Sequence, residues 1–208
     1  MSETLTLFAV FLIGVAAAMI GATVGGGSLL SIPVLIFLGL PPQAAIATDR
    51  LAGLGAAVTA LYKFWKAGKI VWRLVPLLTV LSLVGSLIGA TILINIDPSI
   101  TRYVVGGLVI LLLPVLFLKR DVGLHARRAT RSQVIMGSIL YLFIQILAGF
   151  FGGGTGTLIF YTLMLFFGVT IIQVAATQII PFFVLTVSST ALFASHGFVI
   201  SQNFDFLA

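Results

Sequence analysis

The sequence predicts an all-α polytopic membrane protein built from two related repeats with broken helices. Hydrophobic residues make up 60% of the 208 residues, charged residues make up 8%, and the mean hydropathy is +1.25. A soluble domain carries about 25% charged residues. Several apolar stretches approach the ~20 residues that a helix needs to cross a bilayer. Two glycine-rich motifs, GGGS at Gly25–Ser28 and GGGTGT at Gly152–Thr157, interrupt these stretches.

The apolar stretches define the expected helices. Leu5–Val24 follows Met-Ser-Glu-Thr without the basic residues of a signal peptide, so we expect a retained first helix. At ~1.5 Å per residue, Leu29–Leu40 would reach only about 18 Å, well short of the ~30 Å hydrocarbon core. Its counterpart is the short segment Leu158–Phe167. Either short segment could be a tilted span or a re-entrant half. Further spans are expected at Leu74–Ile96, Ile100–Leu118 and Val134–Phe151.

Sliding the chain along itself reveals an internal duplication. When Gly39 is placed opposite Gly168, Gly25 meets Gly154 and Gly27 meets Gly156. The same shift pairs Ala47-Thr48 with Ala176-Thr177, Phe64 with Phe193 and Gly68 with Gly197. Duplicated units that break at the same point are typical of transporters whose site lies at the repeat interface.

This duplication divides the chain into three parts. We expect a first transmembrane repeat at 1–118, a basic cytoplasmic loop at 119–132 and a second repeat at 133–208. The counterparts of Leu74–Ile96 and Ile100–Leu118 would lie almost entirely beyond Ala208. The second repeat is therefore expected to be truncated. Either the chain is a fragment of a longer protein, which is the favoured interpretation, or its second half departs from the first.

The basic residues indicate the orientation of the repeats. Most Lys and Arg residues lie in two clusters, Lys63–Arg73 and Lys119–Arg131, and cytoplasmic loops accumulate these residues. An even number of spans separates the clusters, so both can face the cytoplasm. The counterpart of the first cluster, Leu192–Gln202, has no Lys or Arg. Opposite charge at equivalent loops predicts inverted repeats. The placement of the basic residues in these loops indicates that the net charge of +6 orients the protein in the membrane and does not bind nucleic acid.

The two glycine-rich breaks form the first part of the candidate binding site. A helix broken at membrane depth survives only when it is buried in protein or lines a wet cavity. Its N-terminus presents unpaired N–H groups and the positive end of a dipole, which suit an anion. Hydroxyl groups there could cap the helix or donate to a bound oxyanion. Close helix packing is the alternative reason for such glycines. The predicted residues are Gly25, Gly26, Gly27, Ser28, Gly154, Thr155, Gly156 and Thr157.

Asp49 and Arg50 are the only charged residues in the apolar stretch Ala44–Thr59. An ionisable residue inside a membrane segment costs ~2.5–3.5 kcal/mol on insertion scales and points to function. Adjacent residues do not face each other on a helix. We interpret Arg50 as the fixed positive charge for an anion, and Asp49 as a group that orients Arg50 or carries a coupling proton. The alternative is that both side chains snorkel to the headgroups. Flanking polar groups of this site are Thr48, Thr177 and Gln178.

Taken together, the motifs resemble those of the TauE/SafE family of sulfite exporters. The first copy contains Gly21, Gly25–Gly27, Pro33, Gly39, Ala47-Thr48, Arg50, Tyr62, Trp65, Gly68 and Ile70, and the second contains Gly152–Thr157, Gly168, Ala176-Thr177 and Gly197. The resemblance implies a polytopic bacterial or archaeal inner-membrane protein of two related halves. It also implies movement of sulfur-containing anions such as sulfite or sulfoacetate. Asp49 is a departure, because the family often has Asn or Ser there.

These observations predict a transporter that moves a small anion across the cytoplasmic membrane, with the lipid bilayer as its other partner. A passive anion channel and a non-transporting accessory subunit are the alternatives, and a homo-oligomer stays open. An enzyme is not expected, because His125 and His196 are the only histidines and no HExxH motif or paired aspartates occur. The absence of cysteine excludes disulfides and thiolate metal sites, and neither a metal nor a cofactor is predicted.

Overall fold

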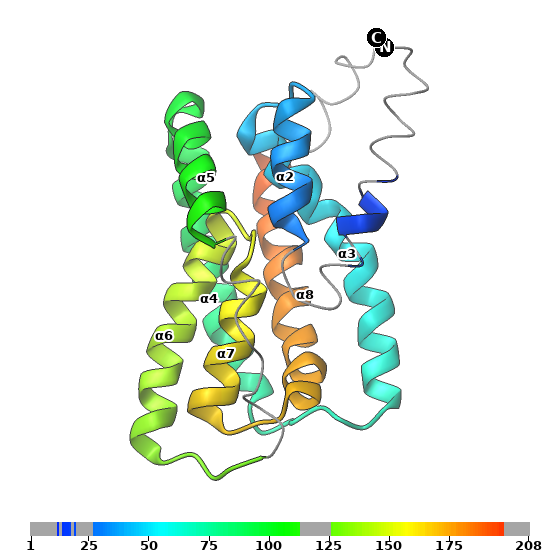
Figure 1. Cartoon of the computed structure of the whole chain (residues 1–208), viewed down its shortest axis with the longest axis vertical. Helices are drawn as coiled ribbons and strands as arrows, with labels where there is room; N and C mark the ends of the chain where they lie inside the picture. The colour runs from blue at the N-terminus through cyan, green and yellow to red at the C-terminus, as the bar shows by residue number, and fades with distance from the viewer. Residues whose placement is uncertain (1–11, 13, 18, 20–26, 113–125, 198–208) are drawn as a thin grey trace.

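The computed structural model describes residues 12, 14–17, 19, 27–112 and 126–197. This part of the chain is all-helical and contains no strand. The predicted first helix, Leu5–Val24, falls largely outside it, although the described residues of that stretch are helical. The helices form one bundle (Figure 1). They are α2 (Ser28–Phe37), α3 (Pro42–Lys66), α4 (Val75–Asn95), α5 (Pro98–Leu112), α6 (Arg131–Phe150), α7 (Thr155–Phe167) and α8 (Ile171–Ser195).

Four of these helices, α3, α4, α6 and α8, are long and apolar enough to cross a membrane. The chain is thus a multi-pass membrane protein. Helices α4 and α6 confirm the spans predicted at Leu74–Ile96 and Val134–Phe151. Helices α2 and α7 are short and apolar, as predicted for Leu29–Leu40 and Leu158–Phe167. Helix α5 covers the first part of the span predicted at Ile100–Leu118.

Local sequence explains where the long helices begin. Pro42 occupies the first turn of α3, where its missing N–H group costs nothing. Helices α6 and α8 each start with a capping box, in which a threonine and the glutamine three residues later satisfy each other's backbone N–H groups. The pairs are Thr130 with Gln133 and Thr170 with Gln173.

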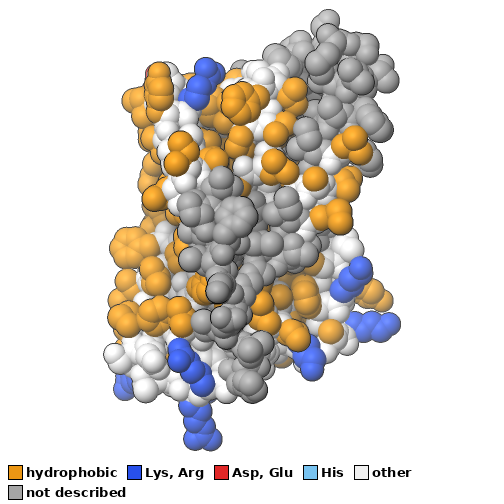
Figure 2. All heavy atoms as spheres, viewed as in Figure 1, with side chains coloured by type: hydrophobic (Ala, Val, Ile, Leu, Met, Phe, Trp, Pro, Cys, Tyr) orange, Lys and Arg blue, Asp and Glu red, His pale blue; other side chains and the backbone are white. Residues whose placement is uncertain are grey.

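Most of the basic side chains that Figure 2 shows gather at the lower end of the bundle, and basic colour also appears at the upper end. The cytoplasmic loop expected for the first cluster does not include Lys63 and Lys66. They belong to the last turn of α3, where positive charge complements the negative end of the helix dipole. The second cluster also reaches into a helix, because α6 begins at Arg131.

Helices α6 and α7 form an antiparallel hairpin. The Arg127 N–H group, just before α6, donates to the carbonyl of Gly168, just after α7, at 2.8 Å. The end of α7 therefore lies beside the start of α6, and α7 returns to the end from which α6 came (Figure 1). Gly154 and Gly168 bound α7 with positive φ angles of 74° and 68°, which glycine adopts without strain.

The two short helices begin near the middle of the bundle and run in opposite directions. Figure 1 shows α2 running to the upper end and α7 to the lower end, and the long helices that follow them, α3 and α8, also run oppositely. The starts of α2 and α7 touch. A Cβ atom added to Gly154 would lie 2.8 Å from Cδ1 of Leu29, the second residue of α2. Leu29 is buried there together with Phe150 and Phe151.

Candidate functional site

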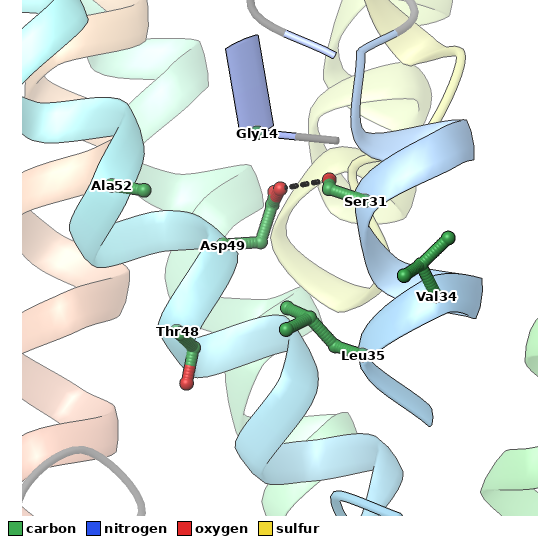
Figure 3. A pocket seen from close by; sticks show the side chains of 7 residues that line it. All are labelled: Gly14, Ser31, Val34, Leu35, Thr48, Asp49 and Ala52. Carbon is green, nitrogen blue, oxygen red and sulfur yellow. Dashed lines mark hydrogen bonds between the residues drawn. The ribbon is translucent and has the colours of Figure 1, made fainter. Parts of the chain in front are cut away.

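Asp49 and Arg50 on α3 each contact a different glycine-rich break, because their side chains point to different helices. Asp49 is half-buried and faces the start of α2. Its carboxylate accepts a hydrogen bond from the Ser28 hydroxyl at 2.7 Å and another from the Ser31 hydroxyl. Figure 3 shows Asp49 and Ser31 pointing toward one another across the space between α3 and α2. Asp49 thus brings a negative charge to the positive end of α2.

Arg50 faces the second break instead. Its side chain is only 5% exposed, and its Nη2 group donates to the carbonyl of Ala148 near the end of α6. A Cβ atom on Gly152 would lie 2.9 Å from Cζ of Arg50, so the guanidinium rests directly on the glycine backbone. Because Arg50 is buried in protein, the snorkelling alternative is wrong for this residue.

The surroundings of Arg50 leave part of its hydrogen-bonding capacity unused. Its Nε atom is buried and has no partner among the described residues. The start of α7, two residues after Gly153, adds the positive end of a helix dipole to the same region. A buried N–H donor without a partner costs about 1–3 kcal/mol. A bound anion would accept a hydrogen bond from the Nε group of Arg50 and would be stabilised by the positive end of the α7 dipole.

The hydroxyl groups near the breaks do not cap the short helices. Gly27 and Gly154 are the N-cap residues of α2 and α7, and neither helix has a side-chain cap. The Ser28 hydroxyl goes to Asp49, and the Thr155 hydroxyl donates to the carbonyl of Gly152 at 2.7 Å. The remaining predicted residues of the breaks are Gly156, which is half-buried, Thr157, which is buried, and Gly25 and Gly26, which lie outside the described residues.

Thr48, Thr177 and Gln178 are not brought together around one ligand position. The Thr48 hydroxyl donates to the carbonyl of Ala44 within α3 at 2.8 Å. Thr177 accepts a hydrogen bond from the Val71 N–H group at 2.9 Å, so it ties α8 to the connection between α3 and α4. Gln178 accepts from the hydroxyl of Tyr141 at 2.8 Å. These three residues belong to separate contacts.

Gln178 instead belongs to a buried polar cluster that sequence reasoning missed. Ser82 on α4, Tyr141 on α6 and Gln178 on α8 are linked in a row, with 3.0 Å between the Ser82 and Tyr141 oxygens. Gln145, one turn beyond Tyr141, is fully buried, yet its amide has no hydrogen-bond partner among the described residues. The four-residue spacing of Tyr141 and Gln145 was a signal for a shared helix face.

A cavity of about 140 Å³ lies beside Asp49 (Figure 3). Its lining is mostly apolar, and the polar side chains that reach it come from α2 and α3. The lining residues are Gly14, Ser31, Val34, Leu35, Thr48, Asp49 and Ala52. Ser31 was not among the predicted site residues, although it lies three positions after Ser28 and so shares its helix face.

Comparison with known proteins agrees with a membrane transporter. The family described as "Sulfite exporter TauE/SafE" matches residues 10–207. A "Probable membrane transporter protein" of Haemophilus influenzae is 27% identical over 187 residues, which are 90% of this chain and 73% of that protein. YfcA of Escherichia coli K12, also a probable membrane transporter protein, is 28% identical over 163 residues, 78% of this chain and 60% of that protein. YdhB of Bacillus subtilis is 26% identical over 200 residues. No solved structure matches the chain.

Proposed function

This chain belongs to the sulfite exporter TauE/SafE family, and we propose that it transports a small anion across the bacterial cell membrane with Arg50 as the central binding group. The observation that carries the proposal is the placement of Arg50. A permanently charged side chain lies buried in a membrane-spanning helix, against the second glycine-rich break, with one donor unpaired. Such residues mark substrate pathways in membrane proteins.

The chemistry of this position favours an oxyanion. A guanidinium group binds oxygen atoms of anions through charge-assisted hydrogen bonds, which are about twice as strong as neutral ones. The positive end of the α7 helix dipole would add to this attraction. We propose a sulfur oxyanion or an organosulfonate as the substrate. The family description supports the sulfur assignment, whereas the charge and the donors support only the anion.

We also infer an alternating-access mechanism between two inverted repeats, 1–118 and 133–208. The opposite directions of α2 and α7, and of α3 and α8, support inversion (Figure 1). The contact between Leu29 and Gly154 supports a site where the two repeats meet. In transporters of this kind, one repeat rocks against the other around a fixed midplane site. Asp49 and Arg50 would then lie on the helix that crosses this interface.

The test is anion flux into proteoliposomes, with sulfite and sulfoacetate as substrates. Arg50→Gln should lower flux about 30-fold or more, because losing one partner of a buried charge interaction costs about 2–5 kcal/mol and 1.4 kcal/mol corresponds to tenfold. Arg50→Lys should retain part of the flux, because the charge persists. Arg102→Gln is the matched control, since Arg102 is exposed on α5. Equal amounts of each variant in the membrane would be verified first. Normal flux by Arg50→Gln would refute the role of this residue.

A further inference from the structure

We propose that Asp49 is a coupling-cation site, at which its carboxylate and the hydroxyls of Ser28 and Ser31 take up one monovalent cation, Na⁺ or a proton, with each transported anion. This inference rests on the proposed anion transport and adds the partner that drives it. It assigns separate ligands to the two adjacent charges of α3, the anion to Arg50 and the cation to Asp49.

The contacts of Asp49 separate it from the anion position. Its carboxylate turns to α2, whereas the guanidinium of Arg50 turns to α6 and Gly152. Two hydroxyls and one carboxylate meet at Asp49, so every potential ligand atom at this position is an oxygen. Oxygen ligands of this type suit small, hard cations. One carboxylate supplies one negative charge, so a monovalent cation neutralises Asp49 and leaves the positive charge of Arg50 to be balanced by the anion.

The cavity gives a cation access to this group. Asp49, Ser31 and Thr48 supply its polar lining, and its volume of about 140 Å³ exceeds the space that a single water needs. Figure 3 shows the carboxylate of Asp49 at the edge of this space. By contrast, Arg50 is 5% exposed and does not line the cavity. A cation could therefore reach Asp49 without passing the guanidinium.

No other described acidic group competes for the cation. Helices α2, α5 and α8 are the main neighbours of α3. Within their bounds, α2 and α8 carry no Asp, Glu, Lys, Arg or His, and α5 carries only Arg102. On α3 itself the other charged residues are Lys63 and Lys66 in the last turn. The field at Asp49 thus comes chiefly from Arg50 and from the start of α2.

Electrostatics couples the two sites. An anion at Arg50 would lie close to the carboxylate of the preceding residue, and like charges repel strongly where water is scarce. Neutralising Asp49 removes this repulsion, so cation binding should strengthen anion binding, and the anion should strengthen cation binding by the same factor. Couplings of this type are typically roughly 5- to 150-fold.

The experiment compares gradients in proteoliposomes that contain the whole chain. Sulfite or sulfoacetate uptake is measured with a Na⁺ gradient at equal pH, with a pH gradient without Na⁺, and with no gradient. We expect one of the two gradients to raise uptake at least fivefold, which identifies the cation. In Asp49→Asn the ratio of driven to undriven uptake should fall to about one, because the neutral amide cannot release a cation. Asp97→Asn makes the same chemical change in an exposed turn and should keep the ratio of the unaltered protein.

A second variant keeps the proposal testable if Asp49→Asn does not insert. Ser31→Ala removes one hydroxyl ligand and should raise the Na⁺ or proton concentration for half-maximal uptake several-fold. An unchanged half-maximal concentration would overturn the proposal, as would anion uptake by the unaltered protein that ignores both gradients. In those cases the proposed anion transport would stand. If the unaltered protein moved neither anion under any gradient, the proposed function itself would fail.

Discussion

At the scale of single residues, the neighbours Asp49 and Arg50 illustrate how a helix separates two opposite charges. One residue step rotates the side chain by about 100° on an α-helix. Asp49 consequently reaches the serines of α2, and Arg50 reaches the end of α6. The pair therefore does not simply neutralise itself. Asp49 contacts the first glycine-rich break and Arg50 contacts the second. For this reason we propose a cation as the ligand of Asp49 and an anion as the ligand of Arg50.

Gly152 is the residue on which the position of Arg50 depends most directly. Its φ angle is +83°, and a Cβ atom would lie 2.9 Å from Cζ of Arg50. We expect Gly152→Ala to lower anion flux at least tenfold, because the methyl group would push the guanidinium from its place and strain the backbone by about 1–3 kcal/mol. Flux and thermal stability in detergent would be measured together.

Gly55→Ala on α3 is the control for this substitution. No atom lies within 4 Å of a Cβ added at Gly55, which has helical geometry. Alanine there should leave flux unchanged. If Gly152→Ala left flux unchanged, as this control should, transport would not depend on the close contact between Gly152 and Arg50.

At the scale of helices, α4 and α6 form a tight pair. A Cβ atom added to Gly85 on α4 would lie 2.6 Å from Cβ of Gln145 on α6. One turn on, a Cβ atom on Gly89 would collide with the α6 backbone near Ile146 and Phe150. Small residues let membrane helices approach closely, since packing rather than the hydrophobic effect holds them together. Gly85 and Gly89 on α4 therefore serve helix packing.

Substituting Gly89 by Leu should therefore destabilise the bundle. Overpacking of a core costs typically 1–3 kcal/mol, and here the obstacle is backbone, which cannot move aside like a side chain. We expect a lower unfolding temperature in detergent. Gly107→Leu on α5 is the control, because no atom lies within 4 Å of a Cβ added there. Equal unfolding temperatures for the two variants would contradict tight packing of α4 on α6.

At the scale of the whole molecule, the basic end of the bundle defines its orientation. The end of α3 and the start of α6 lie at the same lower end in Figure 1, and Figure 2 shows Lys and Arg side chains gathered there. The end of α8 lies at the opposite end (Figure 1). Because cytoplasmic loops are enriched in Lys and Arg, the lower end should face the cytoplasm.

Cysteine labelling tests this orientation. Ser195 at the end of α8 and Lys66 at the end of α3 are both exposed, and the chain has no native cysteine. A membrane-impermeant thiol reagent added to intact cells should label Ser195→Cys and not Lys66→Cys. After permeabilisation both should react. Labelling of Ser195→Cys only from the cytoplasmic side would contradict the orientation and, with it, the inverted repeats.

Much of this architecture could be predicted from local features. The apolar runs located α4 and α6, and the glycine-rich breaks located the starts of α2 and α7. Asp49 and Arg50 stood out because charge is rare in a membrane segment. The roles assigned to the thirteen candidate site residues stay predictions, and for Thr177 and Gln178 the structure assigns hydrogen bonds to Val71 and Tyr141.

What the sequence determined by itself is the membrane class, the family and the positions of the breaks, because hydropathy, glycine content and motif spacing are properties of consecutive residues. Tertiary structure alone decided which break each charge faces, that α6 and α7 form an antiparallel hairpin, and that Ser31 donates a hydrogen bond to Asp49. These features depend on contacts between residues far apart in the chain, such as Arg50 with Ala148. Such contacts arise from how the helices pack and rotate against one another, which no local pattern specifies.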